Sequence, residues 1–135
     1  MRTAMKRICC ILPLLLALSC SSTDPVPVSP PRYLFQIDYQ SGFQGDSVIV
    51  SIDGKVVNSG RFTSDSLGFA ASDVLSLLAS SHTLHVSAIS NRVKGTYDTT
   101  FVQPSTRLYC GIAYSSNATW KVRMSLQPFS YFPTD

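Results

Sequence analysis

The chain contains no glutamate, a single tryptophan and no apolar run long enough to cross a bilayer. All eight acidic residues are Asp, which is a poor helix former where Glu is a good one, so the composition disfavours a helical protein. The longest apolar stretch, 8–18, would cover as a helix about half of a hydrocarbon core that is about 30 Å thick. A permanent transmembrane helix is therefore disfavoured as well.

The cysteines do not provide a disulfide framework. Cys9 and Cys10 lie in the N-terminal apolar stretch and Cys20 follows it, which leaves Cys110 alone in the rest of the chain. An exported domain of roughly 100 residues can be held together by its hydrophobic core without a disulfide. Because Cys110 alternates with apolar residues such as Leu108, we expect a buried, inert thiol that binds no metal.

Residues 1–19 have the three parts of an export signal. A basic start with Arg2, Lys6 and Arg7 precedes the apolar stretch, and the small Ser19 ends it. These three bases also account for the formal net charge of +3, because the remaining chain has as many Lys and Arg as Asp residues. The other bases are scattered, with no basic stripe interleaved with aromatic residues, so we expect no nucleic-acid partner.

The run Leu16-Ala17-Leu18-Ser19-Cys20 resembles the lipobox of bacterial lipoproteins. It departs from the family's pattern at Ala17 and Leu18, where the family usually has Leu followed by a small residue. The resemblance implies that the Cys20 thiol takes a diacylglyceryl group, that the leader is cut before it, and that the new amine is often acylated too, for example with palmitate. A thiolate is nucleophilic enough to form the thioether, and two or more acyl chains anchor a protein stably. The alternative is an ordinary signal peptide cut near Ala17 or Ser19.

Residues 20–32 form a proline-rich linker behind the cysteine. Its four prolines favour polyproline II, which makes a semi-stiff spacer of about 3.1 Å per residue. We expect a tether that lifts the domain some tens of ångströms from the lipid; the alternative is a docking site for a proline-recognising partner. Together with the lipobox, it implies a lipid-anchored protein of the bacterial cell envelope, at the outer membrane, that does not span the membrane.

Alternating apolar residues predict β-strands from residue 33 onward. Tyr33, Phe35, Ile37 and Tyr39 share one face of the first strand. The pair Asp53-Gly54 predicts a type I′ hairpin turn. Similar alternation or apolar runs lie at 48–52, 84–88, 97–101, 108–114 and 120–126.

These segments predict an all-β fold, a single antiparallel β-sandwich of immunoglobulin-like kind over residues 33–135. In the segment 72–81, Val74, Leu77 and Leu78 have helical spacing, but the run is short and lies between strands, so we favour a strand. The order of segments resembles small bacterial lipoproteins that carry one immunoglobulin-like or transthyretin-like module. That resemblance implies no particular activity.

No catalytic residue, metal site or cofactor is predicted, and we do not expect an enzyme. His82 and His85 are three apart, which puts them on opposite faces of a strand and prevents joint metal ligation. No serine lies in a nucleophile elbow or a Ser-x-x-Lys pair. The loop Asp residues lack the spacing of an EF-hand and are better explained as turn formers.

Aromatic side chains outside the strand alternation are the candidate ligand contacts. Exposed aromatic rings bind sugars, peptides or proteins through a large contact area at small entropic cost. The aromatic candidates near the C-terminus have an alternative role, which is to fold back over an open sheet edge. Trp120 is expected in the core because it is in phase with the core face. The candidates are Phe43, Phe69, Phe129, Tyr131 and Phe132.

The sequence therefore predicts a lipid-anchored binding or structural interaction module, with the membrane and an envelope protein or glycan as partners. One alternative is a glycan-binding or peptide-binding module that uses the exposed aromatic residues. The alternative from another class is an envelope hydrolase or a metal-dependent enzyme. An exposed cluster of the aromatic candidates would favour binding, whereas a pocket that joins a His with two or more Asp would favour the enzyme.

Overall fold

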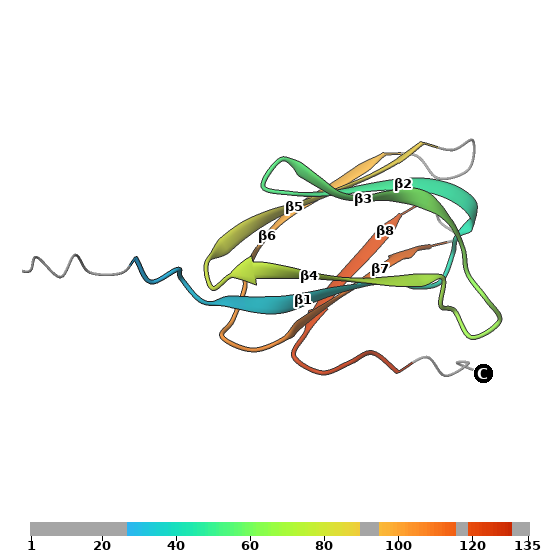
Figure 1. Cartoon of the computed structure of the whole chain (residues 1–135). Helices are drawn as coiled ribbons and strands as arrows, with labels where there is room; N and C mark the ends of the chain where they lie inside the picture. Colours follow the sequence, from blue (N-terminus) through green and yellow to red (C-terminus); the bar gives the residue numbers. More distant parts are fainter. Residues whose placement is uncertain (1–26, 90–94, 116–118, 131–135) are drawn as a thin grey trace, which may run out of the picture.

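The computed structural model describes residues 27–89, 95–115 and 119–130, which form eight strands (Figure 1). Within these ranges there is no helix, and so none that is long and apolar enough to cross a membrane. The strands are β1 (Arg32–Tyr39), β2 (Gln44–Ile52), β3 (Lys55–Thr63), β4 (Ala71–Leu78), β5 (Ser81–Ile89), β6 (Thr96–Val102), β7 (Leu108–Tyr114) and β8 (Trp120–Ser125).

The strands form two four-stranded sheets, which lie one above the other in Figure 1. Sheet A has the order β4-β1-β7-β8 and sheet B the order β3-β2-β5-β6. All neighbours are antiparallel except β1 and β7, which run parallel with Phe35 opposite Leu108. The predicted all-β sandwich is confirmed. Its strand order differs from the immunoglobulin arrangement, in which the first strand pairs with the second, because here β1 pairs with β4 and β7.

The core lies between the sheets and follows the predicted alternation. Phe35, Ile37 and Tyr39 of β1 are fully buried, and Val50 of β2 faces them from the other sheet. Cys110 of β7 is also fully buried, as predicted. Burial raises the pKa of its thiol to about 12, so very little of it is thiolate at neutral pH and it is a poor nucleophile.

The hairpin between β2 and β3 has the predicted turn. Asp53 and Gly54 both adopt positive φ angles, 52° and 75°, as a type I′ turn requires. The turn is fixed to β5 by two bonds: the Thr83 backbone N–H donates to Asp53 Oδ1 at 2.8 Å, and the Asp53 N–H donates to the Thr83 carbonyl at 2.9 Å.

Residues 71–78 form β4, which confirms the strand that we favoured over a helix. The helical spacing of the apolar residues is misleading because Val74 points outward and is 54 % exposed. Leu75 and Leu77 point inward at a spacing of two, which is the period of a strand.

The prediction for Phe43 was wrong. This residue was expected to be an exposed ligand contact, but its side chain lies in the core with 1 % exposure. The β2–β3 register shifts between Gln44 and Asp46, so the side-chain alternation changes phase and Phe43 and Asp46 both point inward. The Phe43 ring packs against Phe62 and Trp120, at centroid distances of 6.1 and 6.3 Å. It is therefore not available to a ligand.

Candidate functional site

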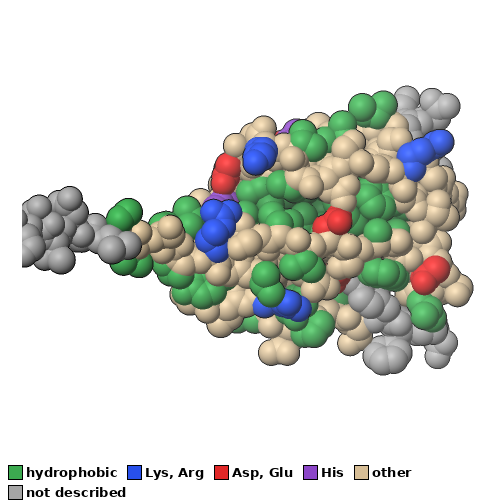
Figure 2. All heavy atoms as spheres, viewed as in Figure 1, with side chains coloured by type: hydrophobic (Ala, Val, Ile, Leu, Met, Phe, Trp, Pro, Cys, Tyr) green, Lys and Arg blue, Asp and Glu red, His purple; other side chains and the backbone are tan. Residues whose placement is uncertain are grey.

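An apolar groove opens along one side of the sandwich, between β3 and β4. These strands are edge strands of the two sheets, so no further strand of the described residues covers the gap between them. The groove has a volume of about 610 Å³, within the usual range of ligand pockets. Figure 2 shows this side of the molecule, with hydrophobic side chains in the hollow and charged side chains at its border. The apolar lining consists of Ile52, Val56, Val57, Leu75, Leu77 and Leu78.

The far end of the groove is closed by a hydrogen bond between the two strands. Asn58 Nδ2 of β3 donates to Asp73 Oδ2 of β4. Asn58 follows the lining residue Val57 and Asp73 precedes the lining residue Leu75, so the bond lies at the end of the groove away from the hairpin turn.

Two cationic side chains lie at the other end. Lys55 begins β3, and Arg32 begins β1 and donates from Nη2 to the Ser76 carbonyl oxygen at 2.6 Å. Within the described ranges neither side chain forms an ion pair. The groove therefore has an apolar body and a positively charged border.

His82 lies at the same end as these cations and forms a pair with Asp53. Its Nδ1 is 2.6 Å from Asp53 Oδ2, and its Nε2 is 3.0 Å from the Leu78 carbonyl oxygen. A carbonyl oxygen only accepts hydrogen bonds, as does an ionised carboxylate, so this geometry favours a proton on both ring nitrogens. Burial lowers the pKa of His82, but the bonds to Asp53 and Leu78 outweigh it and raise that pKa above its ordinary value. The hydrogen bond from His82 lowers the pKa of Asp53.

Ser80 completes a Ser–His–Asp arrangement, because its Oγ is 3.1 Å from His82 Nε2. In a hydrolase triad that nitrogen is unprotonated and takes the proton of the hydroxyl. Here it is directed at the Leu78 carbonyl and holds its own proton in that bond. The arrangement therefore stabilises the contact between the β2–β3 and β4–β5 turns as an ion pair, and it does not activate Ser80.

The melting temperature is expected to fall as the pH rises through the pKa of His82. Because this pKa is raised above 6.5 in the folded state, the imidazolium stabilises the fold fully below about pH 6.5, and that contribution is lost above the folded pKa. Asp53 acts in the opposite direction: its contribution is present above about pH 3.8 and is lost as the pH falls through its lowered pKa. Circular dichroism melts of wild type and His82→Asn between about pH 4 and 9 test this. We expect a smaller alkaline loss in the variant, and equal losses would contradict the ion pair.

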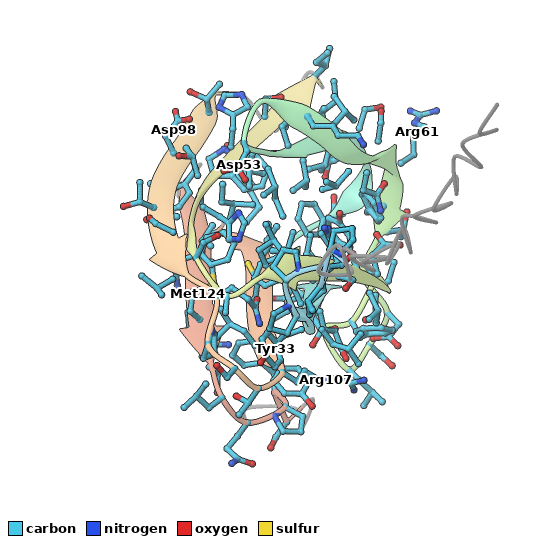
Figure 3. All side chains as sticks on the ribbon, turned by 60° about the vertical axis from the view of Figure 1, so that its left-hand side comes forward. Tyr33, Asp53, Arg61, Asp98, Arg107 and Met124 are labelled. Carbon is cyan, nitrogen blue, oxygen red and sulfur yellow. The ribbon has the colours of Figure 1, made fainter. Side chains whose placement is uncertain are left out.

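His85 lies on the opposite face of β5 from His82, as predicted. Its Nδ1 is 2.6 Å from Asp98 Oδ1 of β6, so the two histidines pair with different carboxylates. Figure 3 shows Asp53 at the hairpin turn and Asp98 on β6. No group of three or more His, Cys, Asp or Glu side chains suited to a metal ion occurs in the part of the chain that the structure describes.

The remaining aromatic candidates lie apart from the groove lining. Phe69 is partly buried in the β3–β4 loop, where Asp65 Oδ1 accepts bonds from the backbone N–H groups of Leu67 and Phe69. Phe129 is also partly buried: its ring is 5.1 Å from the Arg123 guanidinium carbon and lies against Gly111 of β7. It thus folds back over the outer face of sheet A. With Phe43 in the core, the described candidates do not form the exposed cluster that would have favoured binding through the aromatic residues.

Several predicted residues lie outside the described ranges, and their predictions stay predictions. They include the two C-terminal aromatic candidates and the whole lipobox. These residues are Tyr131, Phe132, Leu16, Ala17, Leu18, Ser19 and Cys20. Trp120 is partly buried and packs against the core, in agreement with its expected position.

The sequence alone did not reveal the groove or the Asp53–His82 pair. One signal was present: His82 is in phase with Leu84 and Val86, and a polar residue at a core-facing position indicates a buried partner. The groove itself depends on how the ends of the two sheets lie against each other, which local patterns do not contain. In comparisons with known proteins, the chain matches no protein-family model and no curated protein.

Proposed function

We propose that the protein is a lipid-anchored binding or structural interaction module of the bacterial envelope, and that the groove between β3 and β4 is its binding surface. The observation that carries the proposal is the apolar groove of about 610 Å³ beside Arg32, which no described strand covers. Sandwich edges are normally covered or blocked, and an open apolar hollow on a folded domain is typical of a ligand or partner site.

The position of the groove fits an anchored protein. Arg32 borders the groove and is also the first residue of β1, so the groove lies at the end of the domain where the linker enters (Figure 1). The linker of residues 20–32 spans at most about 40 Å if extended as polyproline II. A lipid at Cys20 would hold the groove within that distance of the membrane surface.

The strand order also bears on the kind of module. Of the two that the sequence resembles, we favour the transthyretin-like one, because the pairing of β1 with β4 and β7 departs from the immunoglobulin order. The β-sandwich does not depend on the anchor, because all eight of its strands lie between residues 32 and 125, behind the leader.

Cys20→Ser is expected to move the protein from the membrane fraction to the soluble fraction of the envelope. Serine has no thiol to take the lipid, so the anchor is lost completely. The measurement is cell fractionation followed by immunoblotting. Cys110→Ala is the matched control, because it removes the buried thiol of β7, and it should stay with the membranes. Full membrane retention of Cys20→Ser would rule out lipidation at this residue.

A further inference from the structure

We infer that the groove binds a fatty acid from the surrounding membrane, with the acyl chain in the apolar hollow and the carboxylate at Arg32 and Lys55. This inference deepens the proposed function and rests on it. The two ends of the groove differ in chemistry, and that difference indicates an amphiphile.

The body of the groove suits an acyl chain. Its walls are aliphatic: Val56 and Val57 come from β3, and Leu75 and Leu77 from β4. Val56 is 56 % exposed, so a bound chain would remove apolar surface from water, which is the main driving force for such binding. The Asn58–Asp73 hydrogen bond bridges β3 and β4 at the far end, which leaves the end beside Arg32 and Lys55 for the polar head.

The charge at the mouth suits a carboxylate. Among the described residues, Asp53 is the one acidic residue in the lining, and both of its oxygens are already engaged, Oδ2 with His82 and Oδ1 with the Thr83 N–H. The guanidinium of Arg32 and the ammonium of Lys55 are not neutralised by an ion pair within the described ranges. A guanidinium also matches a carboxylate geometrically, because it can donate two parallel hydrogen bonds.

An added peptide strand is the other occupant to consider, and the contacts at the groove oppose it. Strand addition needs a free row of backbone donors and acceptors along an edge strand. On β4 the Ser76 carbonyl already accepts from Arg32. The Asn58–Asp73 bond bridges β3 and β4 and would obstruct a strand that runs between them. The groove therefore offers side-chain surface more than backbone partners.

Calorimetric titration of laurate into the exported chain carrying Cys20→Ser tests the inference. This variant lacks the protein's own acyl groups, so they cannot occupy the groove. Laurate is expected to bind at least about tenfold more tightly than dodecyltrimethylammonium, which has the same chain and the opposite charge. Mass spectrometry of material extracted from the purified lipidated protein is expected to show fatty acid.

Three further substitutions locate the binding site. Val56→Asp places a charge in the groove at an exposed position and should weaken laurate binding at least about tenfold. Lys55→Gln should weaken it about three- to fivefold, as expected for one partly exposed ion pair. Val102→Asp is the matched control, because Val102 is 68 % exposed on β6 and does not line the groove. It should leave the affinity unchanged, and thermal melts confirm that each variant is folded.

Several results would overturn the inference. These are no binding of laurate, equal binding of the cationic amphiphile, or binding that Val56→Asp leaves intact. A peptide in the extract in place of fatty acid would assign the groove to a peptide. Laurate binding by Cys20→Ser but not by the lipidated protein would assign it to the protein's own anchor. None of these results changes the fractionation of Cys20→Ser, so the anchored module is tested separately.

Discussion

Gly42→Ala is expected to destabilise the domain by at least about 3 kcal/mol and to lower the melting temperature by more than about 12 °C. Gly42 has a φ of 100°, which other residues rarely adopt, and a Cβ atom built there would lie 1.7 Å from the Tyr114 carbonyl oxygen. The contact is between two backbone segments, so no side-chain rotation relieves it. The turn is also tied to β7, because the Tyr114 N–H donates to the Ser41 carbonyl at 3.0 Å.

Gly54→Ala is the matched control for this prediction. Gly54 also has a positive φ, 75°, but a Cβ atom there would have no neighbour within 4 Å. The cost should be the conformational penalty alone, about 1–2 kcal/mol. Thermal and urea unfolding of both variants measure the difference. Equal destabilisation would mean that the close approach of Gly42 to Tyr114 does not exist.

Phe35→Ala is expected to cost about 3–5 kcal/mol, a large share of the about 5–15 kcal/mol by which an ordinary domain is stable. The Phe35 ring is fully buried and stacks on Phe101 at a centroid distance of 4.8 Å, so it links β1 of sheet A to β6 of sheet B. Removal of the ring leaves a cavity between the sheets. Urea denaturation monitored by circular dichroism gives the change in the free energy of unfolding.

The neighbouring residue provides the control for Phe35. Leu34 is the next side chain along β1, points outward and is 41 % exposed. Leu34→Ala removes a side chain of similar chemistry from the other face of the same strand, and it should cost less than about 1 kcal/mol. Similar losses for the two variants would contradict the assignment of these faces.

Local patterns predicted what depends on a few neighbouring residues. The alternation of Phe35, Ile37 and Tyr39 predicted both the strand β1 and the face that it buries, because side chains of a strand alternate with a period of two. Asp53-Gly54 determined the hairpin because few residue pairs tolerate two positive φ angles. The segment around Val74 was predicted as a strand because it is short and lies between strands, and the structure bears this out.

Features that depend on distant residues could not be predicted in this way. A bulge after Phe43 changes the phase of the alternation, and nothing in the apolar pattern marks the extra residue. The groove brings Val56 next to Leu75, and that proximity follows from the packing of two sheets and not from either strand. Asp53 was correctly predicted as a turn residue, but its bond to His82 depends on the return of β5 beside β2.

The parallel pairing of β1 with β7 has a consequence for how the chain folds. Phe35 lies opposite Leu108, so sheet A cannot be completed until almost the entire domain sequence is available. Pairings between distant segments carry a large loop-closure cost, and all-β domains of this kind typically fold in milliseconds to seconds, slower than helical bundles. For a chain exported as we propose, sheet A cannot close before β7 has been made, and this order of events favours export of the unfolded chain.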